Sequence, residues 1–201
     1  MLTEDQPAAQ PLFVDFVNTL HWYEGVPIEL IGNATDLAVW LGEHALPTAS
    51  GEAGLQALLA LRDHARAATE SLASGQVPAA ADLAALNAAL GASTGRLVLN
   101  DADTSFAQLA FEADEDEQLP AFRIALSFAN FLESGQRHRL KLCANPGCGF
   151  AFVDTSTNGT RRWCFMRYCG NRMKLRAFRQ RQASGLGLRA ALDDQAASRT
   201  A

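Results

Sequence analysis

The sequence predicts a mostly α chain of the α+β class: a helical N-terminal domain with a small β-hairpin, followed by a small treble-clef-like finger with a C-terminal basic helix. Apolar residues recur at helical spacing through most of residues 1–134, which predicts the helical domain. All four cysteines lie between residues 143 and 169, which predicts the finger. With 201 residues, 48% of them apolar, the chain can fill a medium domain plus a small one.

Five segments are expected to form helices, because apolar residues three or four apart give each of them an apolar face. These segments are residues 11–20, 35–46, 51–74, 78–93 and 119–134. Thr35 or Asp36 can cap the second helix, and Pro78 and Pro120 suit the first turns of the fourth and fifth.

Residues 95–111 interrupt this helical pattern. Two short β-prone runs flank the turn-forming sequence NDADTS at residues 100–105. We therefore expect the β-hairpin of the N-terminal domain at this point.

Charge divides the chain into two unequal parts. Residues 1–137 hold 5 Lys and Arg against 19 Asp and Glu, a balance of −14. Residues 138–201 hold 12 Lys and Arg against 3 Asp and Glu, a balance of +9, and the whole chain carries −5. Such asymmetry indicates that the two parts meet different partners, although a basic tail can also serve solubility alone.

The sequence contains no motif of a known catalytic type. The four histidines lie far apart, and there is no serine elbow, phosphate-binding glycine loop or paired-histidine helix. An enzyme is therefore not expected. No apolar run is long enough to cross a membrane, and the acidic N-terminus is unlike a secretory signal, so we expect a cytoplasmic protein with no membrane partner.

Three polar residues stand in the apolar first helix: Asp15, Asn18 and Thr19. Residues three and four apart share a helix face, so these side chains can line a pocket for a small ligand. The alternative is that they hydrogen-bond a neighbouring loop, which is how most buried polar side chains are satisfied.

The cysteines are spaced as two equal pairs. Cys143 and Cys148 are separated by four residues, as are Cys164 and Cys169, and fifteen residues lie between the pairs. This spacing is typical of a tetrahedral four-thiolate zinc site, in which no position remains for substrate, so the metal is expected to be structural. An iron–sulfur cluster, a disulfide and free thiols are the alternatives.

The residues around the cysteines predict the elements of the finger. The sequence NPGCG forms a turn at the first pair, FAFVD forms a short strand, and residues 155–162 return the chain as a hairpin loop to Trp163. A helix is expected from about Cys169 onward, with Leu175 and Phe178 packed on the finger's core. Turn, hairpin and helix in this order describe a treble clef.

Cations crowd this segment beyond what the metal needs. Residues 138–181 hold eight Arg and two Lys against one acid, Asp154. On the expected helix, Arg172, Arg176 and Arg179 fall in one stripe about 60° wide. Because a stripe of like charges destabilises an isolated helix, it indicates a polyanionic partner, and arginine suits phosphate and guanine edges.

Residues 143–181 resemble the CGNR zinc finger, named for the tetrapeptide present here as Cys169, Gly170, Asn171 and Arg172. The acidic helical part, with FVDFVNT near its start, resembles the ABATE domain that precedes this finger. The resemblance implies a bacterial stress-induced transcription regulator whose finger binds DNA and whose larger domain binds an unidentified small ligand. Phe165 departs from the small or polar residue expected there.

Together these interpretations divide the chain into an ABATE-like domain (1–136), a CGNR-type finger (137–182) and a poorly ordered or partly helical tail (183–201). The residues expected at DNA are Arg161, Arg162, Arg167, Asn171, Arg172, Lys174, Arg176 and Arg179. The alternative is a finger that binds RNA or a protein, since Trp163, Phe165 and Tyr168 can stack on bases. A homodimer is left open. Folding of the acidic residues 112–117 onto the basic helix is a further hypothesis.

Overall fold

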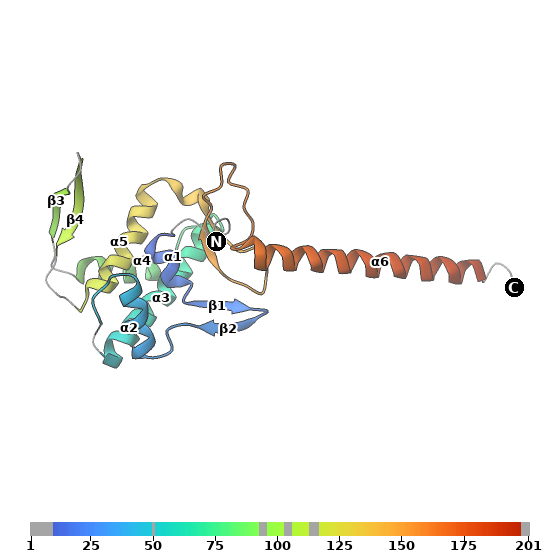
Figure 1. Ribbon diagram of the computed structural model, residues 1–201, viewed down its shortest axis with the longest axis horizontal. Coiled ribbons are helices and arrows are strands. Elements are labelled where there is room, and N and C mark those ends of the chain that lie inside the picture. The colour runs from blue at the N-terminus through green and yellow to red at the C-terminus, as the bar shows by residue number, and fades with distance from the viewer. Residues whose placement is uncertain (1–9, 50, 93–95, 103–105, 113–116, 198–201) are drawn as a thin grey trace.

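The structure is a computed structural model that describes residues 10–49, 51–92, 96–102, 106–112 and 117–197. A body of packed helices occupies its centre, one β-hairpin lies at one end, and a long helix runs out from the other (Figure 1). Among the described residues, none of the helices has the length and apolar character needed to cross a membrane.

The helical body confirms the five predicted helices. They are α1 (Leu12–Val17), α2 (Ala34–Glu43), α3 (Gly51–Ala73), α4 (Ala80–Ala92) and α5 (Leu119–Glu133). The short α1 lies at the centre of the core and contacts both α3 and α5. Phe13 and Phe16 are fully buried, and the ring of Phe13 meets Phe128 edge-on at 5.0 Å between centroids. Asn33 caps α2, accepting from the backbone N–H groups of Thr35 and Asp36, so neither of the predicted caps is used.

The first helix is shorter than the pattern predicts. It ends at Val17, and the chain continues into an antiparallel hairpin formed by β1 (Leu20–Tyr23) and β2 (Val26–Glu29), which was not expected. The carbonyl of Thr19 accepts a hydrogen bond from the backbone N–H of Leu30, 2.8 Å away, so the strand ladder takes up a group that a continued helix would have bonded.

The predicted β-hairpin is present. Strands β3 (Arg96–Ala102) and β4 (Phe106–Glu112) pair in antiparallel register, and its turn at 103–105 lies outside the described residues. In the acidic segment 112–117, residues 113–116 also lie outside them. The β3–β4 hairpin lies at the opposite end of the body from the long helix (Figure 1), and folding of this segment onto that helix stays a prediction.

The finger begins with a 3₁₀ turn and ends in the long helix. Its elements are η1 (Gln136–Arg139), β5 (Leu140–Leu142), β6 (Ala151–Val153), the π-helical turn η2 (Met166–Gly170) and α6 (Asn171–Ala197). Strand β6 pairs with β5, the strand before the first cysteine pair, so the expected hairpin partner near Trp163 is wrong. Three strand residues of the finger, Leu140, Ala151 and Val153, belong to the same apolar core as the helices.

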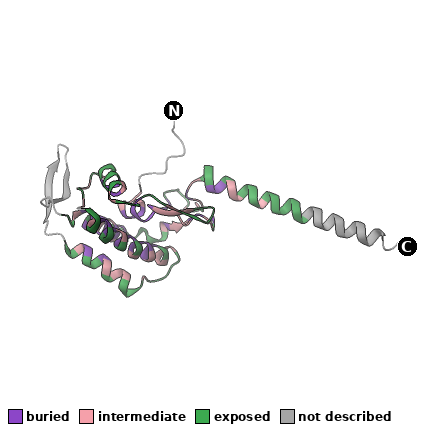
Figure 2. Ribbon diagram, turned by 90° about the horizontal axis from the view of Figure 1, so that it is seen from below, coloured by how far each residue is buried: buried purple, intermediate pink, exposed green. Residues whose placement is uncertain are grey.

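Helix α6 projects from the finger (Figure 1), and most of its residues between 171 and 184 are exposed (Figure 2). Leu175 is 48% exposed and Phe178 is 51% exposed, so the expectation that they pack on the finger's core is wrong. The small core of the finger is filled instead by Phe150, Phe152, Trp163 and Phe165 around the cysteines.

Candidate metal centre and nucleic-acid interface

The four cysteines meet in one buried cluster. The Sγ atoms of Cys143, Cys148, Cys164 and Cys169 all lie within 4.8 Å of one another. Cys164 Sγ is 3.6 Å from the Sγ atoms of both Cys148 and Cys169. A tetrahedral zinc ion with Zn–S bonds of about 2.3 Å requires sulfurs about 3.8 Å apart, so this cluster suits one zinc ion. A cluster of several irons would need sulfurs spread farther apart.

The ligand loops are shaped by Asn145, which is buried between the two cysteine pairs. Its Nδ2 donates to Cys169 Sγ at 3.5 Å, and its Oδ1 accepts from the Gly147 N–H at 3.3 Å. A donor aimed at a thiolate stabilises its negative charge and orients the sulfur. Asn145 therefore ties the first pair of ligands to the second.

The thiols influence one another's ionisation strongly. Hydrogen bonds from Cys148 and then from Cys164 lower the pKa of Cys143 to about 2. The hydrogen bond to Cys143 raises the pKa of Cys148 to about 12, and hydrogen bonds of Cys164 with Cys143 and then with Cys148 raise the pKa of Cys164. Four thiolates whose Sγ atoms lie within 4.8 Å of one another repel each other strongly, and a cation between them relieves this repulsion.

Three cations of the finger are held inside it by the buried carboxylate of Asp154 and by backbone carbonyls. Lys141 Nζ lies 2.6 Å from Asp154 Oδ2 and 2.5 Å from the Gly159 carbonyl. Arg139 donates to the Ser156 carbonyl at 2.6 Å, and Arg161 donates to the carbonyls of Trp163 and Cys164. These three cations, which we call the internal set, fix the loop that precedes Cys164.

The pKa of Asp154 reflects these contacts. Burial raises it, but the hydrogen bonds from Lys141 and Ser156 outweigh burial and lower the pKa well below its ordinary value. The carboxylate therefore stays ionised at neutral pH. Lys141 Nζ also donates to the Arg161 carbonyl at 3.2 Å, and the backbone N–H of Arg161 donates to Asp154 Oδ2 at 2.9 Å. The Arg161 guanidinium lies 4.7 Å from the ring centre of Phe152.

A second group of cations points into solvent. Its members are exposed in the structure, and we call them the external set: Arg162, Arg167, Lys174, Arg176, Arg179 and Arg181. Asn171 is exposed beside them, whereas Arg172 is half-buried. Of the residues expected at DNA, the structure thus leaves most on the surface, holds Arg161 inside the finger and engages Arg172 with the helical body.

Arginine 66 of α3 joins the body to the finger. Its Nη1 donates to the Leu20 carbonyl at 2.6 Å and its Nη2 to the Gly149 carbonyl at 2.7 Å. The guanidinium also lies 4.6 Å from the ring centre of Trp22, and burial lowers the pKa of Arg66. Gly149 has a φ of +63°, and a Cβ there would lie 2.6 Å from the Trp22 ring, so this close approach requires glycine.

The polar group of the first helix is divided between different contacts. Asn18 donates to the Ala151 carbonyl and accepts from the Ala151 N–H, both at 2.8 Å. Thr19 donates to the Phe16 carbonyl at 2.7 Å and accepts from Arg62 at 3.0 Å. Asp15 instead lies 3.9 Å from His44. Asn18 and Thr19 thus bond within the protein, and ligand binding by these three residues stays a prediction.

The sequence reasoning missed the β1–β2 hairpin and the arginines beneath it. Arg62 is 4% exposed and makes two hydrogen bonds of 2.6 Å to the carboxylate of Glu29 on β2. Two signals could have found these features: a glycine, Gly25, between two β-prone runs, and arginines four apart, at 62 and 66, on an otherwise apolar helix face.

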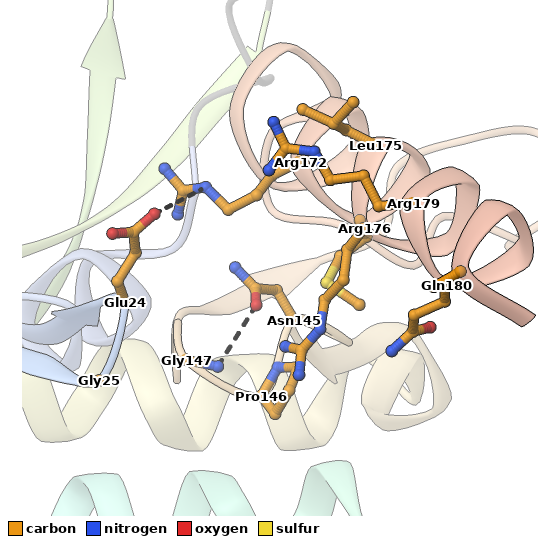
Figure 3. Close-up of a pocket in the computed structure, with 12 residues that line it drawn as sticks. Glu24, Gly25, Asn145, Pro146, Gly147, Arg172, Leu175, Arg176, Arg179 and Gln180 are labelled. Atoms are coloured by element: carbon orange, nitrogen blue, oxygen red, sulfur yellow. Dashed lines mark hydrogen bonds and ion pairs between the residues drawn. The ribbon is translucent and has the colours of Figure 1, made fainter. Parts of the chain in front are cut away.

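A groove of about 800 Å³ is lined by the hairpin tip, by residues 145–147 and by the first part of α6. Glu24 lies on one wall, Asn145 and Pro146 form the floor, and Arg176 of α6 extends toward Pro146 (Figure 3). The described lining residues carry three arginines and one carboxylate. The groove is therefore electropositive and open to an anionic partner.

Comparison with known protein families identifies both parts of the chain. Residues 10–135, more than half of the chain, match the model of ABATE, described as "Putative stress-induced transcription regulator". The chain belongs to the ABATE family. Residues 139–182 match the CGNR zinc finger, which agrees with the four-cysteine cluster. A search of curated proteins found no match.

The family and the structure agree on several points. The ABATE description names a transcription regulator and no enzymatic activity. The zinc-finger match and the buried sulfur cluster together assign a structural zinc site to Cys143, Cys148, Cys164 and Cys169. The ABATE match ends at residue 135 and the finger match begins at 139, yet the two segments share one apolar core.

Proposed function

We propose that this ABATE protein binds duplex DNA through the external set of cations on its CGNR finger. The observation that carries the proposal is that these cations are exposed on a zinc-supported finger and on the helix α6 that projects from it. An exposed run of arginines without acidic partners stabilises a bound polyanion and destabilises the free helix. Zinc, when bound, supplies the folding free energy that holds α6 on the finger.

The groups that contact phosphate are expected to be Arg162, Arg167, Lys174, Arg176 and Arg179. Five phosphate contacts give a dependence of log affinity on log salt with a slope of about −5. Exposed Asn171, at the start of α6, is proposed to contact a base edge, because its amide can pair with adenine.

The test is a double variant, Arg176→Ala with Arg179→Ala, in the metallated full-length chain. We expect duplex affinity to fall at every sequence tested and the salt slope to shrink by about 2, since two phosphate contacts are lost. Fluorescence anisotropy of a labelled duplex across a salt series measures both. Arg123→Ala is the matched control, because Arg123 is an exposed arginine on α5 of the body. Equal affinity and slope in the double variant and the control would rule out the proposed surface.

A second candidate is recognition of single-stranded RNA. Tyr168 is 61% exposed next to the external cations and can stack on an unpaired base. Trp163 and Phe165 pack against the cysteine cluster, which reduces their availability for stacking. Competition between a duplex and a single-stranded RNA distinguishes the two candidates, and Tyr168→Ala should weaken only RNA binding.

Sensing of a small ligand by the ABATE domain is proposed on the family's name as a stress-induced regulator. Asp15 is the residue of the predicted group that is least engaged by the protein, and burial raises its pKa. Asp15→Asn is expected to abolish a ligand-induced shift in melting temperature while leaving duplex binding intact. A ligand screen by thermal shift that shows equal shifts for both proteins would reject Asp15 as the site.

A further inference from the structure

The arginine of the CGNR tetrapeptide is engaged by the helical body. Arg172 Nε lies 3.6 Å from Glu24 Oε1 (Figure 3). The guanidinium also lies 4.3 Å from the ring centre of Tyr23. Tyr23 and Glu24 form the tip of the β1–β2 hairpin, so both contacts come from the ABATE domain. The side chain of Arg172 is 28% exposed and that of Glu24 is 64% exposed, so the pair sits at the open rim of the groove.

The backbone at the hairpin tip aims Glu24 at the groove. Glu24 has a φ of 55° and Gly25 a φ of 84°, the left-handed conformation that a two-residue hairpin turn requires at both positions. Asparagine, aspartate and glycine tolerate this conformation better than glutamate does. The turn itself therefore does not explain why a glutamate, with its carboxylate toward Arg172, occupies position 24.

The tip is held against the finger by backbone hydrogen bonds. The N–H of Trp22 donates to the Cys148 carbonyl at 2.9 Å, and the N–H of Gly25 donates to the Gly147 carbonyl at 3.3 Å. A Cβ at position 147 would lie 3.2 Å from the Gly25 nitrogen, so glycine allows the two backbones to approach. These bonds hold the hairpin tip in a fixed position on the loop between Cys143 and Cys148, and they fix the position of the Glu24 backbone relative to α6.

Glu24 has a distinct electrostatic position in this groove. It supplies the single carboxylate among the described lining residues, opposite Arg172, Arg176 and Arg179. A phosphate entering the groove would meet the repulsion of Glu24 and would compete with it for Arg172. The charge is exposed, so its effect on an approaching polyanion is strongest at low salt and is screened over about 10 Å at 0.1 M.

We propose that the hairpin tip of the ABATE domain forms part of the nucleic-acid-binding surface and that Glu24 restrains Arg172, so that DNA phosphate must displace this carboxylate to use the arginine. The inference rests on the proposed binding of duplex DNA by the finger. Through this contact the ABATE domain acts directly on DNA binding, because any shift of the β1–β2 hairpin changes how readily Arg172 can bind phosphate.

The experiment compares Glu24→Gln with Glu43→Gln in the full-length, zinc-loaded chain. Glutamine keeps the size of Glu24 and removes its charge, and Glu43 is an exposed glutamate on α2 of the body that serves as matched control. We expect Glu24→Gln to tighten binding of a labelled duplex about three- to tenfold at low salt, with a smaller gain at high salt. Glu43→Gln should leave the affinity at the wild-type value.

A third comparison isolates the role of Arg172. Adding Glu24→Gln to an Arg172→Ala background should recover little of the gain, because the arginine that Glu24 restrains is absent. A full gain in that background would overturn the restraint on Arg172 and leave only general repulsion. Melting temperatures of all variants check that the fold is retained.

The outcomes separate this inference from the proposed function. If the wild-type chain binds duplex and Glu24→Gln behaves like Glu43→Gln, the restraint is refuted and DNA binding stands. If the wild-type chain shows no salt-dependent duplex binding, both fail together. A gain confined to Glu24→Gln and dependent on Arg172 supports both.

Discussion

Two sets of cations in one finger differ in their surroundings: one set is bonded within the finger and the other is exposed to solvent. The internal set, Arg139, Lys141 and Arg161, bonds to Asp154 and to backbone carbonyls of the loop before Cys164. The external set, with Arg176 and Arg179 on α6, extends into solvent. The two sets are alike in residue type and close in sequence, so composition does not tell them apart. The comparison teaches that a cation's role follows from whether the fold supplies acceptors, a carboxylate or backbone carbonyls, for its N–H groups.

Removal of zinc should have the largest effect on stability, because the positions of both sets of cations depend on the fold of the finger. The metal is expected to contribute on the order of 10 kcal/mol to folding of the finger. Cys164→Ser, or chelation, should abolish the finger's near-ultraviolet dichroism. It should also lower the melting temperature of the helical body, because Leu140, Ala151 and Val153 belong to the body's core. Thr155→Ser, an exposed change in the same finger, is the control. An unchanged melting temperature for the body would show that the two parts fold separately.

Removal of the internal anion should have the next largest effect. Asp154→Ala leaves Lys141 without its carboxylate in a largely buried site, so we expect a loss of about 3–5 kcal/mol in the free energy of unfolding. Arg176→Ala, taken from the external set, should change stability by less than about 0.5 kcal/mol. Urea unfolding of the zinc-loaded proteins measures both. Similar losses for the two variants would remove the distinction between the sets.

The third change in stability concerns a buried cation of the body, Arg62, whose carboxylate partner is Glu29. We expect it to be smaller than the losses from removing zinc or Asp154. Burial raises the pKa of its partner Glu29, but hydrogen bonds led by that from Arg62 outweigh it and lower the pKa below 4.5. A lowered carboxyl pKa stabilises the fold above pH 4.5, and this contribution is lost as the pH falls through the folded-state value. Glu29→Gln should cost about 1–3 kcal/mol at pH 7.

The difference in unfolding free energy between Glu29→Gln and wild type should shrink as the pH is lowered from 5 to about 3. Both proteins carry the same finger, so acid release of zinc affects them alike. Urea unfolding across this pH range provides the measurement. A difference that stays constant would mean that Glu29 acts through shape alone.

Much of the fold could be predicted because its signals are local. Apolar spacing along α3 and α5 places Leu55, Leu58, Phe122 and Ala125 on buried faces, as found. The β1–β2 hairpin escaped prediction because Glu24 is an unusual residue for its turn and because α1 has an apolar pattern that runs on past its end at Val17. Leu175 and Phe178 were misplaced because the pattern of α6 predicts an apolar face but cannot say whether anything covers it.

The sequence by itself predicted a four-cysteine metal site and a polyanionic partner. Four cysteines in two equal pairs indicate a sulfur-bound metal, and a block of arginines gives strong positive charge, wherever these segments lie in the fold. Both are properties of short stretches of chain, so local reading is sufficient for them.

The tertiary structure alone decided which polar and charged side chains find a partner inside the protein. Asn18 bonds Ala151, Arg66 bonds Gly149, and Glu24 meets Arg172. Each pair joins the helical body to the finger across a long separation in sequence. The electrostatic and hydrogen-bonding energy of a polar group depends on the partner that folding brings within a few ångströms, and no periodicity along the chain encodes that partner.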